Sequence, residues 1–436
     1  MTPNPKIVKS IEKLDYRVTV GDVAAQAGLE LNFAQQGLLT LASEAGGHLQ
    51  VAESGDVVYL FPKNFRSILR NKYWQLRWQK TWQKIWGVLF YLIRISFGIV
   101  LIASVLLMLV ALISIYIAMN SSSNDREGGN RGFGGGFGGG IYFVPRFWIG
   151  DIYWWFDPGY NRRRRQRRRQ ASNSYQMNFL ESVFSFLFGD GNPNADLEEH
   201  RWQTIGSVIR NNKGAVIGEQ IAPYVDEVDQ YEDYMLPVLS RFNGYPEVSP
   251  QGDIIYYFPE LQVMASRRQA EPISTAGYLQ EKLWLFSQAS GGQITLAAGL
   301  GALNIVLALV LGTLLRDGTL AAQLGGVVAF AGSIYWLLLG YGILYLAIPL
   351  VRYFWIQGRN PKIIKRNQDR EGMAISLNQP DLSLSQKLAY AKQFAGQKVI
   401  SDRDLAYTTE DDLLDQNIRN ADKIDRQWQE RLDSNE

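Results

Sequence analysis

Three long apolar runs stand out in the hydropathy pattern of the chain. They occupy residues 95–119, 294–315 and 324–351, and none of them contains a charged side chain. A helix rises about 1.5 Å per residue, so each run is long enough to cross a hydrocarbon layer of about 30 Å. Because eight residues separate the last two runs, we expect these two to form a tight antiparallel hairpin. The pattern predicts three transmembrane helices.

A shorter amphipathic pattern is present twice. Residues 21–62 and 218–259 align without a gap at an offset of 197 positions and share 12 of 42 residues, including the pairs Gly47/Gly244 and Gly55/Gly252. The phrase GDVVYLFP in the first copy becomes GDIIYYFP in the second. The match predicts that one small module is duplicated in the chain.

Helical spacing of apolar residues opens the first copy. It predicts one helix over residues 20–27 and a second over residues 33–45, with Leu38, Leu39 and Leu41 turned inward. Glycines follow both segments, as they commonly do at helix ends.

Alternating residues close each copy. Residues 48–61 read as two strands joined at a Ser-Gly turn, which is a hairpin signal. Helix, helix and hairpin in this order resemble a winged-helix domain. We therefore expect a mainly α membrane protein with about three transmembrane helices and two winged-helix-like α+β modules related by an internal repeat.

The modules lack the charges that reading DNA requires. A recognition helix needs side chains for base edges and cations for phosphates. The second helix of the first copy offers Gln35 and Gln36 but no basic residue, and its counterpart is acidic and contains Pro237. Modules of this kind are expected to bind proteins, and nucleic acid is disfavoured as a partner.

A segment of different composition, residues 121–176, follows the first apolar run. It begins with a glycine-rich stretch typical of flexible linkers. An aromatic patch and an arginine run follow, and their candidate residues for binding lipid or a partner are Trp148, Trp154, Trp155, Arg162, Arg163, Arg164, Arg165, Arg167, Arg168 and Arg169. Each cation near an anionic membrane surface contributes about 1 kcal/mol of attraction. RNA and simple solvation of the run remain alternatives.

Three further helices are expected outside the long apolar runs. Residues 178–189 begin with a cap-like Asn and end at a glycine, and this helix is too short to span. It either lies in the membrane interface or packs on a module. In the tail, residues 357–436, the sequence pattern predicts helices over 382–396 and 409–432. The second of these helices has an apolar stripe.

Composition removes several kinds of chemistry. The chain has no cysteine and two histidines, His48 and His200, so thiolate catalysis, disulfides and Cys- or His-rich metal sites are excluded. No phosphate-binding loop or nucleophile elbow is present. Asp56 and Asp253 each follow a turn glycine, where aspartate normally serves turn geometry. We expect no catalysis, no cofactor and no metal.

Flanking charge indicates the orientation of the hairpin. Basic residues gather after residue 351, whereas its short loop holds Arg316 alone. The positive-inside rule places both hairpin ends on the cytoplasmic or stromal side. Basic residues before residue 95 indicate that the N-terminus lies on that side too. The chain between the N-terminus and the hairpin must then cross the membrane an even number of times, but one span is evident there. The side of the first module and a fourth crossing stay open.

A resemblance to known proteins is carried by three features: the repeated GDVVYLFP and GDIIYYFP phrases, the segment NFLESVFSFLFGDGNPN, and the hairpin that follows. In these features the chain resembles an uncharacterised integral-membrane family of cyanobacteria and chloroplasts. Plant members of that family carry an iron–sulfur biosynthesis label, which a chain without cysteine gives no reason to adopt. The resemblance implies a multi-pass protein of the thylakoid or cytoplasmic membrane.

The expected organisation has seven parts: 1–75 and 195–275, the two modules; 76–120, a basic lead-in and the first span; 121–176, the insert; 177–190, an interfacial helix; 276–356, the hairpin; and 357–436, a polar helical tail. The expected function is a membrane scaffold or assembly factor that presents its modules to protein partners. Alternatives are a membrane-tethered nucleic-acid regulator that uses Arg162–Arg169, and a protein that handles lipids or ions.

Overall fold

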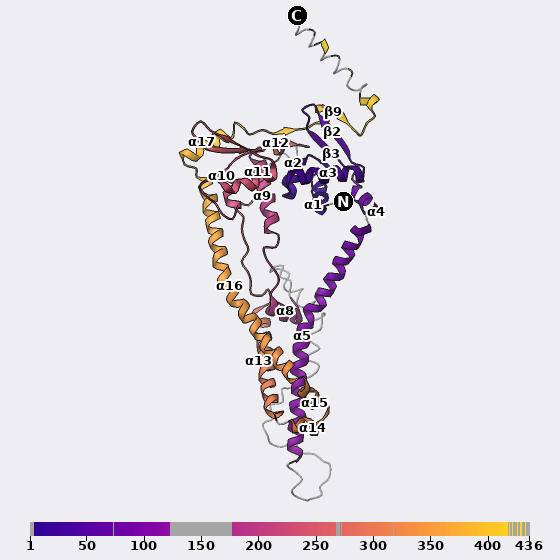
Figure 1. The fold of residues 1–436 in the computed structure, drawn as a ribbon, viewed down its shortest axis with the longest axis vertical. Helices are drawn as coiled ribbons and strands as arrows, with labels where there is room; N and C mark the ends of the chain where they lie inside the picture. Colours follow the sequence, from indigo (N-terminus) through magenta and orange to yellow (C-terminus); the bar gives the residue numbers. More distant parts are fainter. Residues whose placement is uncertain are drawn as a thin grey trace, which may run out of the picture. The chain divides into compact units, whose positions relative to one another are not determined.

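The computed structural model describes residues 4–72, 74–122, 177–266, 271, 273–316 and 318–416, with isolated positions after residue 416. The chain is mainly helical and forms two compact units (Figure 1). Unit 1 combines Met1–Gln83, Asn194–Leu283 and Pro361–Glu436. Unit 2 combines Lys84–Pro193 and Trp284–Asn360. Both expected modules and the tail thus belong to unit 1.

The first module of unit 1 has three helices and three strands. In chain order these are α1 (Pro5–Lys13), β1 (Arg17–Val18), α2 (Val20–Ala27), α3 (Leu31–Ala45), β2 (His48–Ala52) and β3 (Val57–Leu60). The strands follow the order β1-β3-β2, and each neighbouring pair is antiparallel. The two helices and the hairpin expected over residues 20–61 are therefore confirmed as elements.

Local signals explain where these elements begin and end. Thr19 and Asp22 form a reciprocal capping box at the start of α2, and Gly28 ends α2 in the left-handed conformation. Gly55 adopts φ +87° in the hairpin turn. The expectation that Leu39 turns inward is wrong, because its side chain is 45% exposed while Leu38 and Leu41 are buried.

The second module repeats the same order of helices and strands. It contains α9 (Leu197–Asn211), β4 (Ala215–Ile217), α10 (Gly218–Ile221), α11 (Leu236–Phe242), β5 (Tyr245–Val248) and β6 (Ile254–Tyr257), with short 3-10 turns at Ala222–Tyr224 and Asp233–Met235. Its strand order, β4-β6-β5, corresponds to β1-β3-β2. α11 is shorter than α3 because an acidic loop and Pro237 replace the first half of the helix.

The two hairpins agree residue by residue at the offset of 197. His48 pairs with Leu60, and Tyr245 pairs with Tyr257. A side chain at Gly47 would meet the ring of Phe61 at 3.0 Å, and one at Gly244 would collide with the ring of Phe258. The pairing of the first strands differs by one position. Arg17 pairs with Leu60, and Ala215 pairs with Tyr257, although Ala215 lies 198 and not 197 positions after Arg17.

The two modules pack through α2 and α9, where a buried ion pair joins them. Asp22 Oδ1 lies 2.9 Å from Arg210 Nη2, and the side chains are 0% and 4% exposed. Asp22 Oδ2 accepts hydrogen bonds from the backbone of Thr19 and of Ala265. Gly206 allows the close approach, because a Cβ there would lie 2.9 Å from Ala25. Buried charges need such partners, so this contact fixes how the modules meet.

The tail completes unit 1 with one helix and two strands. α17 (Leu382–Ala391) packs on β4 and β6. β8 (Lys398–Val399) pairs in parallel with β7 (Val263–Met264), and β9 (Leu405–Thr408) extends the first sheet beside β2, as Figure 1 shows. The expectation of a purely helical tail is corrected, because these strands form only against other parts of unit 1. Residues 413–416 of the helix expected over 409–432 are helical, and ten of its positions lie outside the described residues. Short helices α4 (Phe65–Lys72) and α12 (Pro259–Gln262) complete the unit.

Unit 2 is a helical bundle. Its elements are α5 (Trp74–Ser122), α8 (Phe179–Phe188), α13 (Gly291–Leu314), α14 (Thr319–Leu324), α15 (Gly326–Ser333) and α16 (Tyr335–Asn378), with α5 beginning and α16 ending in unit 1. Among the described residues, three helices are long and apolar enough to cross a membrane: Ile85–Asn120, Gly291–Leu314 and Tyr335–Asn378. The expected number of apolar helices is confirmed.

The third apolar run is interrupted, contrary to the continuous helix expected over 324–351. Gly325 has φ +59° and separates α14 from α15, and Ile334 leaves helical geometry before α16 begins. The expected tight loop over 316–323 also contains α14 rather than a plain turn. Paired glycines at 325 and 326, both at positive φ, account for the first break.

Glycines bring α13 and α16 into close contact. The ring of Tyr345 covers Gly301, and the side-chain oxygen of Asn304 covers Gly342, where added Cβ atoms would lie 2.5 and 2.7 Å away. Asn304 is fully buried and donates a hydrogen bond to Ser104 of α5. Small residues permit such packing when lipid surrounds a bundle.

The helix α8 packs inside unit 2 rather than on a module. Its residues Val183, Phe186 and Leu187 are buried against α5, α13 and α16. Both ends of α8 reach Arg94 of α5: Arg94 lies 3.9 Å from the sulfur of Met177 and 2.8 Å from Asp190. The sequence left two positions open for α8, in the membrane interface or packed on a module. These contacts exclude the second, because α8 packs on other helices of unit 2.

Replacing Gly301 by Val is expected to lower the free energy of unfolding by about 1–3 kcal/mol, because the new side chain collides with the ring of Tyr345. Thermal unfolding in detergent micelles measures the effect. Gly299→Val is the matched control, since nothing lies within 4 Å of a Cβ there. Equal effects of the two substitutions would contradict this packing.

Replacing Asp22 by Asn is expected to cost about 3–5 kcal/mol of stability in unit 1, because it removes one charge of a buried ion pair. Chemical denaturation of the purified chain provides the measurement. Lys6→Ala is the control: Lys6 also bridges the modules, to Glu199 at 3.0 Å, but both side chains are exposed. That loss should stay below about 1 kcal/mol.

Candidate functional site

The outer surface of α3 is the clearest uncharged surface of the first module. Its exposed side chains, called the α3 face below, are Asn32, Phe33, Gln35, Gln36, Leu39 and Ser43. Phe33 and Leu39 are 46% and 45% exposed. The opposite side of α3 is buried against α1 and β3, and Gly37 receives the side chain of Ile7. The fold therefore holds this polar and apolar mixture on a rigid helix.

No cation belongs to this surface. The charged residues in or next to α3 are Glu30 and Glu44, both acidic. The hydroxyl groups of Thr40 and Ser43 bond to backbone carbonyls of α3 itself. Such a surface offers apolar contact and amide hydrogen bonds, which suits a protein partner better than a phosphate backbone.

The equivalent surface of the second module is different. An acidic loop precedes α11, and Tyr231 and Leu236 beside it are 83% and 62% exposed. Lys387 of α17 lies 2.9 Å from both Glu219 and Glu232. Burial alone would lower the pKa of the Lys387 ammonium, but its hydrogen bonds to these two carboxylates and their negative charges outweigh burial and raise the pKa. The tail therefore neutralises part of the acidic surface.

A second charge cluster, within unit 1, connects Glu281 with the C-terminal part of α16. Glu281 binds Arg366 at 2.6 Å and Arg370 at 2.9 Å. Asn367 accepts from the backbone N–H of Glu281 and donates to its carbonyl. The hydrogen bond from Arg366 lowers the pKa of the Glu281 carboxyl, although burial opposes this shift. Both partners of the carboxylate are permanent cations, so the cluster is structural rather than poised for proton transfer.

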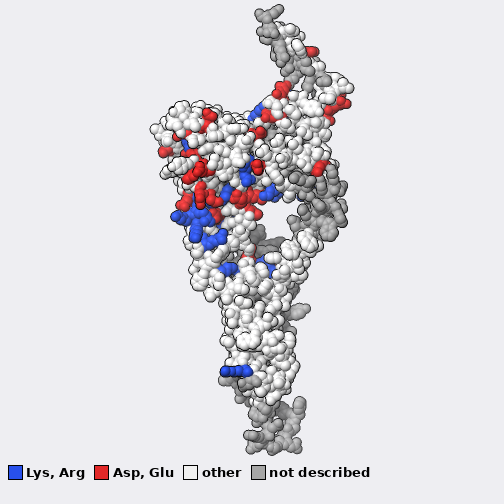
Figure 2. Space-filling model, viewed as in Figure 1, with Lys and Arg blue, Asp and Glu red and all other residues white. Residues whose placement is uncertain are grey.

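Charged residues are distributed unevenly between the units. Figure 2 shows acidic and basic atoms crowded over unit 1 and a largely uncharged surface over α13, α14 and α15. Among the residues of unit 2 whose side chains the structure describes, the charged ones are Arg94, Glu181, Asp190, Arg316, Arg352 and Arg359. Arg352 donates to the carbonyls of Ser185 and Phe186 at the end of α8, and Arg359 lies 5.0 Å from the ring of Trp355.

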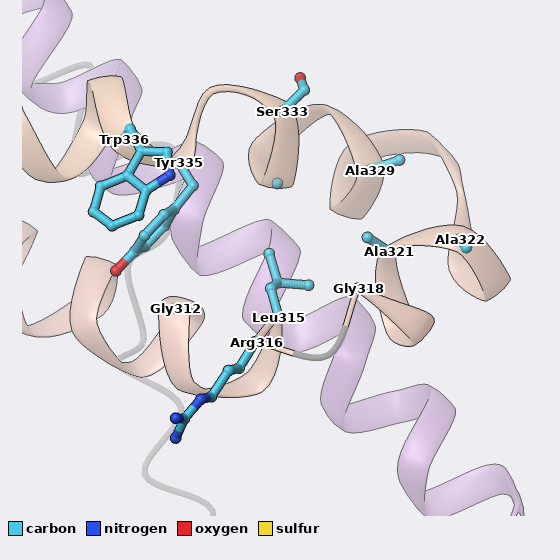
Figure 3. Close-up of a pocket in the computed structure, with 11 residues that line it drawn as sticks. Gly312, Leu315, Arg316, Gly318, Ala321, Ala322, Ala329, Ser333, Tyr335 and Trp336 are labelled. Atoms are coloured by element: carbon cyan, nitrogen blue, oxygen red, sulfur yellow. The ribbon is translucent and has the colours of Figure 1, made fainter.

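One hollow of about 640 Å³ opens between α13, α14, α15 and the start of α16. Figure 3 shows the rings of Tyr335 and Trp336 at one side and alanines of α14 and α15 at the other. Its remaining wall is mostly glycine and alanine, and Arg316 is its one described charged residue. The lining holds no pair of groups for acid–base chemistry.

The sequence-predicted binding residues cannot be placed. Arg162, Arg163, Arg164, Arg165, Arg167, Arg168, Arg169, Trp148, Trp154 and Trp155 lie outside the described residues.

Asp56 and Asp253 do occupy hairpin turns. The carboxylate of Asp56 accepts from Ser54 and Lys398, and that of Asp253 accepts from the hydroxyl of Ser249. In the described part of the chain, no group of three His, Asp or Glu residues lies close enough to hold a metal ion.

The sequence pattern reveals only two of the six residues of the α3 face. It marks Gln35 and Gln36 as exposed polar residues but assigns Leu39 to the core. The signal that could reveal the rest is the width of the apolar pattern, since Phe33 and Leu39 extend it beyond the stripe that one buried helix surface uses.

Acid should destabilise unit 1 through Glu281. Its pKa is lowered from 4.5 in the folded chain, so its stabilising contribution is present above about pH 4.5 and is lost as the pH falls through the lowered value. Glu281→Gln should lower stability at neutral pH and flatten its decline in acid, measured as denaturant midpoints across pH. Glu247→Gln, on an exposed strand residue, is the control. An unchanged pH profile for Glu281→Gln would contradict this assignment.

Comparison with known proteins finds a relative over nearly the whole chain. No family model matches the chain. No solved structure matches it. A protein of Arabidopsis thaliana, named Uncharacterized protein At5g03900, chloroplastic, is 37% identical over 440 residues. The match covers 98% of this chain and 82% of the relative.

Proposed function

The chain belongs to the family of this Arabidopsis chloroplast protein, and we propose that it is an integral membrane scaffold or assembly factor of a thylakoid or cytoplasmic membrane. In this proposal, two winged-helix-like modules on one face of the membrane bind protein partners, without catalysis. The relative's name contributes a chloroplast location and no activity.

Unit 2 supports the membrane assignment. Three apolar helices expose large side chains such as Ile113, Val306 and Leu344. On α16, Trp336 and Trp355 are both exposed and are separated by 19 residues. At 1.5 Å per residue this is about 28 Å, close to the thickness of the hydrocarbon layer, and tryptophans favour its two boundaries.

The contacts of unit 1 support a common side for both modules. Two modules joined by a buried ion pair cannot lie on opposite sides of a bilayer. The chain between them then crosses an even number of times. α8 reaches Arg94, whereas Ser122 ends α5 28 residues later, about 42 Å along the helix.

The membrane side of unit 1 follows from charge. Lys362, Lys365 and Arg366 follow the last apolar stretch in α16, and this excess of cations favours the cytoplasmic or stromal side. The tail lies on the same side, because β9 pairs with β2.

The assignment of winged-helix-like modules related by duplication rests on three agreements. Both segments have the order helix, strand, helix, helix, strand, strand. The three strands that each segment contributes to its sheet have the same order, and the two hairpins have equivalent registers. The identical pairs Gly47–Phe61 and Gly244–Phe258 make the same contact, which gives a physical reason for their identity.

The single observation that carries a protein-binding role is the composition of the α3 face. It exposes Phe33 and Leu39 among amides and one hydroxyl, with acidic residues at its borders. A nucleic-acid surface needs cations at this position.

A photo-crosslinking residue at Gln36 is expected to capture a protein partner when the chain is expressed in its native membrane. The measurement is mass spectrometry of the crosslinked species, with the same residue at Lys9 as control, because Lys9 is exposed on α1. Capture at Gln36 that exceeds capture at Lys9 at least about tenfold is the expected result. Phe33→Asp and Leu39→Asp should remove it.

The opposite result has a clear form. Equal capture at both positions, or salt-sensitive retention of DNA or RNA by the purified chain with a steep dependence on ionic strength, would contradict the proposal. The second outcome would favour the membrane-tethered nucleic-acid regulator instead.

A further inference from the structure

The first module ends in a sheet edge that is filled by the chain's own tail. Strand β9 lies antiparallel to β2, with Gln50 opposite Thr408 and Val51 opposite Tyr407. The backbone N–H of Glu53 donates to Asp404, and that of Thr409 donates to Leu49. The N–H of Leu49 donates to the hydroxyl of Thr409. Alternate residues along this edge, beginning at Leu49, therefore present their backbone to the added strand.

The equivalent edge of the second module cannot accept a strand in this way. At the offset of 197, Leu49 corresponds to Pro246 and Glu53 corresponds to Pro250. Proline has no N–H to donate, and it is a common means of closing a sheet edge. The carbonyl of Val248 between them accepts from the hydroxyl of Tyr390. The two edges are thus chemically opposite although the hairpins agree in register.

Two side chains determine how the tail is held on β2. Leu405 packs beside Ala52, Val58 and Ile400 in a small apolar cluster. Gln416 then closes the outer side of β9, since its amide accepts from the N–H of Thr408 and donates to its carbonyl. The occupant of the β2 edge is therefore an extended segment with an apolar residue and a hydroxyl residue four positions apart.

We propose that the β2 edge, residues 49–53, is a strand-binding site for an extended segment of a partner protein that resembles residues 404–409, and that the tail occupies this site in the absence of the partner. Strand addition obtains affinity from backbone hydrogen bonds and specificity from alternate side-chain pockets, here those of Leu405 and Thr409. The site rests on the proposed protein-binding function, but it lies on the sheet edge and not on the α3 face.

The test uses the full chain in detergent micelles and a synthetic peptide of residues 401–416. Hydrogen exchange reports the amides of Leu49 and Glu53, which bond to the tail. Leu405→Asp places a charge in the apolar cluster, so these amides should exchange at least about tenfold faster than in the unsubstituted chain. Adding the peptide should restore their protection.

Two controls separate strand addition from nonspecific binding. A peptide with Thr409→Pro lacks both the N–H and the hydroxyl that pair with Leu49, and it should restore nothing. Leu49→Pro with Glu53→Pro copies the prolines of the second module, and in the Leu405→Asp chain this pair should abolish peptide binding measured by fluorescence anisotropy. Because β5 tolerates prolines at equivalent places, this variant is expected to fold, and circular dichroism checks it.

Three outcomes would overturn the proposal. The amides of Leu49 and Glu53 stay protected in the Leu405→Asp chain, the peptide fails to restore protection once it is lost, or binding survives the proline pair. A concentration-dependent dimer of the unsubstituted chain that Leu405→Asp abolishes would assign the edge to the tail of a second copy rather than to another protein. Crosslinking at Gln36 does not depend on any of these results, so the two proposals fail separately.

Discussion

The buried contact between Asp22 and Arg210 is the constraint on which the rest of unit 1 depends. Removing one charge of a buried carboxylate–guanidinium pair is strongly destabilising, and both of these side chains have almost no exposed surface. Asp22 also caps its own helix and accepts from Ala265, so it joins the start of α2, the second module and the segment that carries β7. Burial raises the pKa of the Asp22 carboxyl, and the guanidinium of Arg210 and the hydrogen bonds from Thr19 and Ala265 oppose the rise.

Several features follow once the modules are joined. Arg17 donates to the carbonyls of Ala265 and Ile400, which brings the tail against the junction. The tail then continues to the β2 edge as β9, while α17 covers the second sheet. The α3 face stays uncovered by any described element. A surface of this kind on a fixed pair of modules suits a protein that positions partners at a membrane.

The sequence predicts those elements whose signals are local. Apolar length identifies the three long apolar helices, and the Gly-Asp phrases identify both hairpins. The tail strand β9 carries no such signal, because the four residues Leu405–Thr408 become a strand only by pairing with β2. The break at Gly325 is hidden inside a run that is apolar throughout. The position of α8 is also hidden, because it depends on Arg94 meeting Asp190 across 96 positions of the chain. The ion pair of Asp22 leaves one trace, an acidic residue within an otherwise apolar helix face, and its partner in α9 cannot be inferred from spacing.

The central claim is that both modules lie on one face of the membrane, and the absence of cysteine makes it directly measurable. Single cysteines at Lys9 and at Tyr231, both exposed, report the first and second module separately. A membrane-impermeant maleimide applied to sealed vesicles of known orientation should label both sites, or neither, according to which face is outward. Labelling of one site while the other reacts only after the vesicles are opened would place the modules on opposite sides and contradict the account.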